Sequence, residues 1–280
     1  MPARPATLAG VDRSALLASV EHVARQAGQL ILGIYGSEFT VRRKADASPV
    51  TDADEAAEHL IVAALDALGP WPVVAEEAAS RGEAPAAADV FWLVDALDGT
   101  REFAARNGEF TVNIALIEHG VPVLGVVLVP VADRLYAGLN TVRDGLRDGL
   151  HGAAAGQGAW CVEVGQRQAI HCRAMPSVGA TLACSRSHGD SAALAAWLQP
   201  LHIAARVVAG SSLKFGLLAS GQADLYPRFG RTMEWDTAAG DAVLRAAGGR
   251  VENLDGTLLR YGKPGFENPH FIARGALSKP

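Results

Sequence analysis

Two aspartates follow an apolar segment near the middle of the chain. The run from Val90 to Val94 predicts a buried strand, which we expect to stop at Asp95, and Asp98 follows in the turn Asp98-Gly99-Thr100. Open α/β sheets usually place ligand sites beyond the ends of their strands, so this arrangement suits a bound cation or phosphate. Taken alone, however, the fragment favours a structural turn in which Asp95 caps the residues that follow.

Two further acidic segments change this interpretation. The residues 73–75 predict a short strand that runs into Glu76 and Glu77, and Asp236 opens an Ala-rich helical pattern. Each segment alone is typical of a solvated turn or a helix N-cap. Acids at element ends on one edge repel one another unless cations hold them, as would apply to Glu76, Asp95, Asp98 and Asp236. Oxygen-only ligation, with no His or Cys nearby, favours Mg²⁺ or Mn²⁺ over Zn²⁺.

Two better-known acidic motifs do not fit the central segment. An EF-hand loop needs oxygen ligands at its third and fifth positions and Gly at its sixth, where this chain has Leu97, Gly99 and Thr100. Phosphatases that form an aspartyl-phosphate have one residue between their two aspartates, whereas Ala96 and Leu97 both separate Asp95 from Asp98. The segment therefore indicates a different class of metal site.

The acidic segments together resemble those of a known family, the lithium-sensitive, Mg²⁺-dependent phosphatases of the inositol monophosphatase-like type. The resemblance covers roughly residues 12 to 273 and rests on Glu76-Glu77, Asp95-x-Leu97-Asp98-Gly99-Thr100 and Trp235-Asp236-x-Ala238-Ala239-Gly240. Further segments are similar to its bacterial CysQ-type branch, the 3'(2'),5'-bisphosphate nucleotidases: Glu102-Phe103, 106–117, Ser185-Arg186-Ser187-His188 and Gly210-Ser211-Ser212-Leu213-Lys214. The family usually has Pro where this chain has Ala96. Because Ala can adopt a proline-like φ, we expect a stability loss of about 0.4–1 kcal/mol rather than a lost site.

The resemblance implies a site for two or three Mg²⁺ ions, with Mn²⁺ as a possible substitute. Two ions would share Asp95: Glu76, Asp95 and the Leu97 carbonyl would hold the first, and Asp95, Asp98 and Asp236 the second. One ion would lower the pKa of an attacking water while the other stabilises the leaving alkoxide, with no covalent intermediate. The Gly99 and Thr100 amides would hold the phosphoryl oxygens, where charge develops.

Asp54 has two interpretations. The segment Thr51-Asp52-Ala53-Asp54 fits a capping box, in which Asp54 serves the start of a helix. In the family, the acid at this place pairs with the Thr of the DGT turn, here Thr100, to orient the attacking water. Both can hold, because a carboxylate has two oxygens and as many as four acceptor sites.

The resemblance further implies the substrate 3'-phosphoadenosine 5'-phosphate, cleaved to AMP and phosphate in nucleotide recycling during sulfur assimilation. Ser211, Lys214, Arg228 and His188 are the candidate substrate contacts, together with Leu97, Asp98, Gly99, Thr100 and Asp236 at the metal site. A simple N-cap for Ser211, a solvated helix face for Lys214 and a surface position for Arg228 are the alternatives. A phosphatase of inositol monophosphate or a sugar bisphosphate, or a metal-binding regulator without turnover, are the alternative functions.

Composition limits the class of protein. The net charge of −5 argues against a protein that coats nucleic acid, although bound metals would still admit a small anion. Three cysteines without a CxxC pair suggest reduced thiols in a cytosolic protein. No segment has the apolar length of a signal peptide core or a membrane span, so we expect a cytoplasmic protein. For its assembly we expect a monomer or a homodimer. Attachment to the cytoplasmic face of the inner membrane remains open, although no basic amphipathic helix favours it.

The hydrophobic pattern predicts the elements that position these residues. Helices are expected at 14–34 and 52–68, an antiparallel meander at 110–117, 121–129 and 135–137 with Asn113 satisfied in its core, and a Gly-rich surface section at 138–158. Strands and helices then alternate to about residue 253. The expected fold is α+β, a layered αβαβα sandwich in one domain, residues 12–273. An antiparallel-rich, metal-binding half (12–140) would be closed by a smaller α/β half (141–273).

Overall fold

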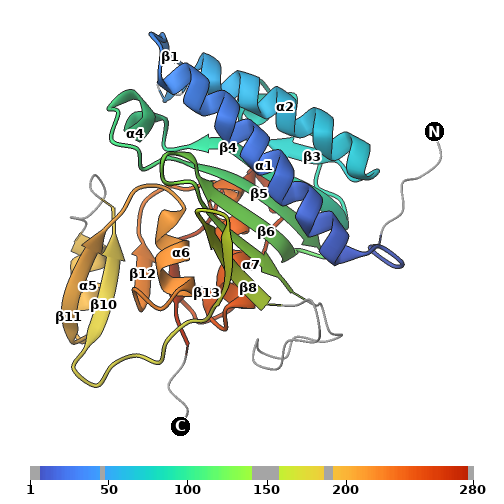
Figure 1. Ribbon diagram of the computed structural model, residues 1–280. Helices are drawn as coiled ribbons and strands as arrows, with labels where there is room; N and C mark the ends of the chain where they lie inside the picture. Colours follow the sequence, from blue (N-terminus) through green and yellow to red (C-terminus); the bar gives the residue numbers. More distant parts are fainter. Residues whose placement is uncertain (1–6, 45–47, 141–157, 186–191, 277–280) are drawn as a thin grey trace.

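A computed structural model describes residues 7–44, 48–140, 158–185 and 192–276 (Figure 1). Its helices are α1 (Arg13–Tyr35), α2 (Asp52–Leu68), α3 (Glu76–Ser80), α4 (Thr100–Ala104), α5 (Ala192–Leu198), α6 (Leu213–Ala219) and α7 (Ala238–Ala246), with short 3₁₀ turns η1 (Pro130–Ala132), η2 (Glu234–Asp236) and η3 (Pro264–Phe266). Its strands form a two-stranded hairpin, a seven-stranded sheet and a five-stranded sheet.

The seven-stranded sheet is the centre of the molecule. Its strand order is β3 (Val73–Ala75), β4 (Val90–Asp98), β5 (Thr111–Glu118), β6 (Val121–Val129), β7 (Arg134–Leu139), β8 (Gly158–Glu163) and β9 (Gln166–Ile170). The pair β3 and β4 is parallel and every other neighbouring pair is antiparallel. The carboxyl ends of β3 and β4 therefore meet at one edge, as the positions of Glu76 and Asp95 predicted.

Helices cover both faces of this sheet because its strands alternate between two apolar sides. Trp92 of β4 lies in a buried cluster with Ile31 of α1 and Ile61 of α2. The next residue, Leu93, faces the other way and lies in a cluster with Phe215 of α6. The sheet thus has α1 and α2 on one face and α6 and α7 on the other (Figure 1).

The five-stranded sheet forms the next layer. Its order is β11 (Ile203–Val208), β10 (Ala180–Cys184), β12 (Leu225–Arg228), β14 (Phe271–Arg274) and β13 (Arg250–Asn253). Helix α5 packs on it through Trp197 and Leu198, which contact the small cluster of Ala180, Leu182 and Leu225. The described residues therefore form the expected αβαβα sandwich.

A β-bulge lies near the carboxyl end of β4. Asp95 pairs with Asn113 of β5 and Asp98 pairs with Thr111, so two residues of β4 lie opposite the single Val112. In a regular strand, residues three positions apart point to opposite faces. The extra residue in the bulge turns Asp95 and Asp98 to the same face. The prediction that the strand stops at Asp95 was wrong, because pairing with β5 continues through Asp98.

Some element boundaries agree with the sequence predictions and others differ from them. The helices expected at 14–34 and 52–68 and the meander are confirmed. Asp236, however, ends η2 and does not open α7, and its Oδ2 accepts from the Met233 amide at 2.9 Å. The stretch that includes Arg42 and Arg43 contributes β1 (Val41–Arg43), which pairs with β2 (Pro49–Thr51). These short elements have too few residues for a periodic signal.

The sheets do not divide the chain at residue 140. Strands β8 and β9 continue the seven-stranded sheet to Ile170, past the boundary expected between the two halves. The Gly-rich section predicted at 138–158 contains the end of β7 and the start of β8, and its residues 141–157 lie outside the described part of the chain. The single-domain arrangement stays a prediction.

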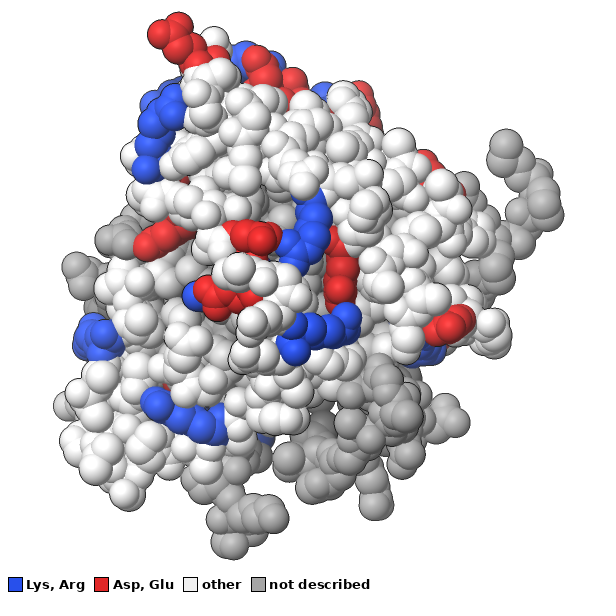
Figure 2. Space-filling view, viewed as in Figure 1, with Lys and Arg blue, Asp and Glu red and all other residues white. Residues whose placement is uncertain are grey.

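Two surface properties bear on function. Within the described ranges, no helix has both the length and the apolar composition needed to cross a bilayer. Acidic and basic side chains lie interspersed near the centre of the face shown in Figure 2, and no extended basic patch lies among the described residues on that face.

Candidate active site

Three carboxylates come together from elements far apart in the chain. Glu76 begins α3 directly after β3, Asp95 lies in β4 before the bulge, and Asp236 ends η2. Each offers an oxygen within 4.8 Å of the others. Burial raises the pKa of Asp95 well above its usual range, and the charges of Glu76, Asp98 and Asp236 raise it further. The pKa of Asp236 is raised for the same reasons, burial first.

Asp98 adjoins this group, although it is not one of the three. Its carboxylate Oδ2 lies 3.1 Å from the Ser212 hydroxyl and 3.4 Å from the Asn113 side-chain amide. Burial raises the pKa of Asp98, while the Lys214 ammonium acts in the opposite direction. The bulge thus brings both aspartates of β4 to the same site.

Leu97 lies within the bulge, outside the paired register of β4 and β5. Its amide donates to Asp95 Oδ1 at 3.0 Å, which holds that carboxylate in place. This bond confirms the interpretation in which the Asp95 side chain caps the residues that follow it. The Leu97 carbonyl as a metal ligand stays a prediction.

A lysine that the sequence did not indicate meets the acidic group. The Lys44 ammonium lies 2.6 Å from Glu76 Oε1 and 2.6 Å from Glu77 Oε1. Burial, opposed by Lys44, raises the pKa of Glu77 to about 7. One ammonium thus pairs with two glutamates, while Asp95 and Asp236 have no ion pair with any described residue.

This donor set fits a hard divalent cation. Buried carboxylates that raise one another's pKa are an unfavourable arrangement for the protein alone, and a divalent ion removes that repulsion. All three side chains supply oxygen, the donor that Mg²⁺ and Mn²⁺ prefer. The cluster can therefore hold a metal ion.

Asp54 makes both of the bonds expected from its two interpretations. Its Oδ2 accepts from the Thr51 amide at 2.8 Å, which closes the capping box of α2, and its Oδ1 accepts from the Thr100 hydroxyl at 2.9 Å. Burial raises the pKa of Asp54, although the hydrogen bonds from Thr51 and Thr100 lower it in part. The pairing with Thr100 is present; its catalytic role stays a prediction.

Gly99 makes the turn between Asp98 and Thr100 possible. Its φ of +99° lies in the region that favours glycine, and a Cβ there would lie 2.2 Å from the Ser211 hydroxyl oxygen. Any other residue would need this unfavourable φ and would displace the Ser211 hydroxyl. The turn brings Thr100 to the start of α4, facing Asp54.

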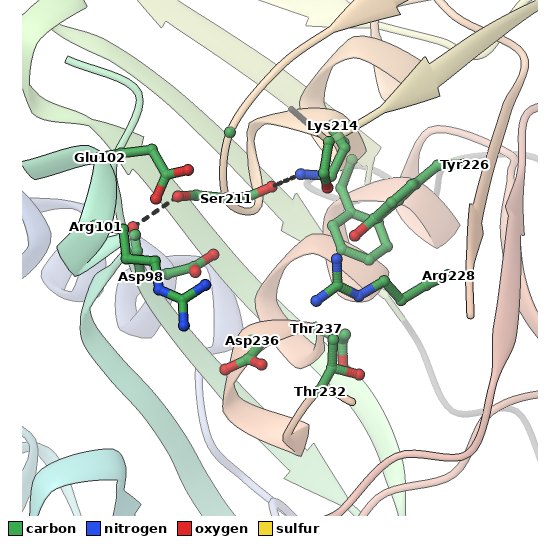
Figure 3. A pocket seen from close by; sticks show the side chains of 14 residues that line it. Asp98, Arg101, Glu102, Ser211, Lys214, Tyr226, Arg228, Thr232, Asp236 and Thr237 are labelled. Atoms are coloured by element: carbon green, nitrogen blue, oxygen red, sulfur yellow. Dashed lines mark hydrogen bonds between the residues drawn. The ribbon is translucent and has the colours of Figure 1, made fainter. Parts of the chain in front are cut away.

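A cavity that is partly open to solvent adjoins the acidic group, and its empty space of about 600 Å³ includes open solvent. Asp98 and Asp236 form the wall that it shares with the carboxylate cluster. In Figure 3 the carboxylates of Asp98 and Asp236 and the guanidinium groups of Arg101 and Arg228 point toward the same space. The rest of the lining consists of Gly99, Glu102, Ser185, Gly210, Ser211, Lys214, Phe215, Tyr226, Thr232 and Thr237.

Lys214 is buried, so its interpretation as a solvated helix residue was wrong. The side chain is 2% exposed, and its Nζ donates to the Ser211 carbonyl at 2.7 Å and the Ala209 carbonyl at 3.2 Å. The ammonium also lies 5.0 Å from the centre of the Tyr226 ring. Burial lowers the pKa of Lys214 to about 8. The periodicity of α6 gave no hint of this, because its polar end reaches backbone carbonyls.

Ser211 lines the cavity without acting as a simple N-cap. The residue before α6 is Ser212, and Ser211 itself has a φ of +48°, which is strained for a residue with a side chain. Its hydroxyl lies 2.8 Å from the Asp98 carbonyl and 2.9 Å from the Glu109 carbonyl (Figure 3). Ser211 therefore ties the loop before α6 to the end of β4.

Of the two remaining predicted substrate contacts, one lies within the described residues and the other does not. Arg228 lines the cavity, where its guanidinium also donates to the Arg231 carbonyl at 3.2 Å. His188 lies outside the described residues. Sequence reasoning did not select Arg101 or Tyr226, and only the position of Arg101 directly after the Asp98-Gly99-Thr100 turn could have indicated it.

Comparisons with known proteins agree with this geometry. The profile of the inositol monophosphatase family matches residues 12–275. The chain is 46% identical over 261 residues to the 3'(2'),5'-bisphosphate nucleotidase CysQ of Escherichia coli K12, covering 91% of this chain and 98% of that one. The crystal structure of CysQ from Bacteroides thetaiotaomicron is similar, with a TM-score of 0.74, 35% identity and coverage of 96% and 99%. An inositol monophosphatase from Anabaena shares the fold, with a TM-score of 0.69, 23% identity and coverage of 95% and 92%. The chain therefore belongs to the inositol monophosphatase family.

Proposed function

We propose that this phosphatase is a 3'(2'),5'-bisphosphate nucleotidase that hydrolyses 3'-phosphoadenosine 5'-phosphate to AMP and phosphate with the help of Mg²⁺. The observation that carries the proposal is a carboxylate cluster next to a cavity lined by Lys214, Arg101 and Arg228, in a chain 46% identical to CysQ nucleotidases. A nucleotide with two phosphates needs both a cation at the scissile phosphate and a second anion site.

Glu76, Asp95, the Leu97 carbonyl, Asp98 and Asp236 are the residues that would hold Mg²⁺. When bound there, the metal supplies an activated water and stabilises negative charge on the leaving oxygen. The number of ions per site and the use of Mn²⁺ are part of the proposal. Substitution of Asp98 or Asp236 should cost more than the roughly 10–100-fold that loss of an outer partner costs in metal sites.

Thr100 and Asp54 would orient the attacking water. The Thr100 hydroxyl donates its only proton to Asp54 Oδ1 at 2.9 Å, so its lone pairs remain to accept a hydrogen from water. That bond directs the water oxygen toward the phosphorus. Asp54 keeps the hydroxyl in this orientation because its other oxygen is held by Thr51.

The cavity would bind the rest of the substrate. Arg228 and Arg101 line it, and each can form the paired hydrogen bonds that suit a phosphate. Lys214 would contribute a positive charge beside them, and Tyr226 an aromatic ring. His188 stays a candidate contact on the resemblance alone.

Parallel turnover measurements test the proposal. Phosphate release from 3'-phosphoadenosine 5'-phosphate and from inositol 1-phosphate would be measured with Mg²⁺, with EDTA, and with Mg²⁺ plus Li⁺, using Asp98→Asn as the inactive control. We expect Mg²⁺-dependent, Li⁺-inhibited release with the nucleotide strongly preferred. A preference for the inositol phosphate or a sugar phosphate would be consistent with the metal site but would contradict the proposed nucleotide substrate.

A regulator without turnover is the alternative of another class. It requires tight metal binding with no hydrolysis of either substrate, and an Asp98→Asn variant with near-full activity would overturn the ligand assignment itself. A cytoplasmic monomer or homodimer remains the expectation for location and assembly.

A further inference from the structure

Two buried polar side chains, those of Asn113 and Ser212, connect predicted metal ligands that belong to different elements. Asn113 of β5 is 1% exposed, and its side-chain amide nitrogen lies 3.0 Å from the Ser212 hydroxyl oxygen and 3.4 Å from Asp98 Oδ2. Ser212, also 1% exposed, places that hydroxyl 2.6 Å from the Asp236 carbonyl and 3.1 Å from Asp98 Oδ2. Asn113 also pairs with Asp95 across the sheet.

The direction of these hydrogen bonds follows from their chemistry. An ionised carboxylate only accepts, so Asn113 must present its NH₂ group, not its carbonyl, to Asp98. The same NH₂ group donates to Ser212, whose single proton then goes to its nearest acceptor, the Asp236 carbonyl. The bonds form one chain from Asn113 through Ser212 to the backbone carbonyl of Asp236, and the second N–H of Asn113 donates to Asp98 Oδ2.

The Asn113 side chain donates hydrogen bonds to the site, but its own carbonyl oxygen receives none from the described residues. Its Oδ1 is buried and has no hydrogen-bond partner among the described residues. A buried carbonyl without a partner is destabilising, and an apolar residue of similar size would avoid that cost. The expectation that Asn113 is satisfied within the core therefore holds for its NH₂ group, which bonds to Ser212 and Asp98, and was wrong for its Oδ1.

We propose that Asn113 and Ser212 form a hydrogen-bond relay that positions Asp98 and Asp236 for the divalent cation. The relay spans 99 residues of sequence and connects the seven-stranded sheet, the start of α6 and η2. It holds the Asp98 carboxylate and the backbone of Asp236 at a fixed separation, so both residues stay in place before the cation binds. Both are positioning residues, and the inference rests on the proposed metal site.

Mn²⁺ binding to purified protein, followed by electron paramagnetic resonance of the free ion, provides a readout independent of activity. Ser212→Ala and Asn113→Leu are each expected to weaken Mn²⁺ affinity about 10–100-fold. The double variant should lose no more than about the larger single loss, because either change breaks the same relay. Ser220→Ala is the matched control, since its hydroxyl donates to the Gly216 carbonyl at 2.7 Å at the far end of α6 and its affinity should not change.

The outcomes separate the relay from the metal site. A wild-type protein that binds no Mn²⁺ would overturn the proposed metal site. Wild-type affinity in both Ser212→Ala and Asn113→Leu, or fully additive losses in the double variant, would overturn the relay. Circular dichroism in metal-free buffer checks folding; if Ser212→Ala does not fold, the near-isosteric and weakly donating Ser212→Cys is expected to show the same loss.

Discussion

Thr100 is held by one hydrogen bond whose direction determines what the residue can do. Its hydroxyl donates to Asp54, a carboxylate that already accepts from the Thr51 amide and hydroxyl. Thr100 contributes no carboxylate to the cluster of Glu76, Asp95 and Asp236. Its contribution should therefore be to the attacking water and not to metal affinity.

For Thr100→Ala we expect kcat to fall about 10²–10⁴-fold, the usual effect of losing a positioned proton-transfer partner. Mn²⁺ affinity should stay within a few-fold of wild type, and Thr100→Ser, which keeps the hydroxyl, should recover most of kcat. Steady-state kinetics with Mn²⁺ titrations measure both. A variant that loses metal affinity while keeping kcat at saturating metal would show that Thr100 has a different role.

Lys214 should make stability depend on pH. Its pKa falls to about 8 because it is buried, while an unfolded chain keeps it near 10.5. Between these values the unfolded state binds more protons, so a rise in pH favours the folded state. Asp98, Arg228, Glu102 and Glu109 also act on this ammonium, but burial is the largest effect.

Compared with Lys214→Met, wild-type metal-free protein should gain stability, on the order of 1–3 kcal/mol, as the pH rises from about 8 to 10.5. Urea unfolding of both proteins at several pH values gives this difference, in which titrations common to the two proteins cancel. A difference that is flat, or that falls with pH, would contradict a buried ammonium with a lowered pKa.

At the scale of elements, α3 is capped by a neighbouring helix. The residue before α3 is Ala75, whose methyl side chain has no acceptor to cap the free amides. Glu58 of α2 supplies the acceptors: its Oε2 accepts from the Glu77 amide at 2.6 Å and its Oε1 from the Ala78 amide at 2.9 Å. Because Glu76 is the first residue of α3, this contact also orients a predicted metal ligand.

Glu58→Ala should lower the free energy of unfolding by about 1–3 kcal/mol, since two buried amides lose their acceptor. It should also weaken Mn²⁺ binding, because Glu76 is no longer held by a fixed helix start. Glu55→Gln is the matched control on the same helix: its ion pair with Arg42 is exposed, and such pairs contribute about 0–1 kcal/mol. Equal effects of the two substitutions on metal affinity would argue against the capping role.

At the scale of the whole molecule, the acidic cluster joins parts that are otherwise connected mainly by apolar packing. Glu76 and Asp95 belong to the seven-stranded sheet and its edge, and Asp236 belongs to the segment before α7. Charge repulsion opposes their approach, and a bound cation reverses that term. Metal binding should therefore stabilise the folded chain as a whole.

We expect Mg²⁺ at about 100 times its dissociation constant to stabilise the wild-type protein by about 2.7 kcal/mol relative to EDTA. Asp236→Asn should lose most of this increment, yet be at least as stable as wild type in EDTA because one repelling charge is gone. Thermal unfolding of both proteins with Mg²⁺ and with EDTA provides the measurement. An equal Mg²⁺ increment in the two proteins would exclude Asp236 as a ligand.

Much of the architecture was predictable because it depends on short-range patterns. The apolar stripe of α1, the capping box before α2 and the apolar side of β5 formed by Val112, Ile114 and Leu116 each lie within one segment, and all three are present. The acids and the Asp98-Gly99-Thr100 turn identified the chemistry through their types, their spacing and their resemblance to a known family. These features need no knowledge of what packs against them.

Contacts between distant elements were decided only by the tertiary structure. The bulge that turns Asp95 and Asp98 to one face depends on how β4 pairs with β5, and the relay from Asn113 to Ser212 depends on where α6 packs on the sheet. Lys214 is buried because backbone carbonyls and Tyr226 surround it, which no helical period records. A sequence pattern shows which side of an element is apolar, whereas the identity of its partner is set by the packing free energy of the whole chain.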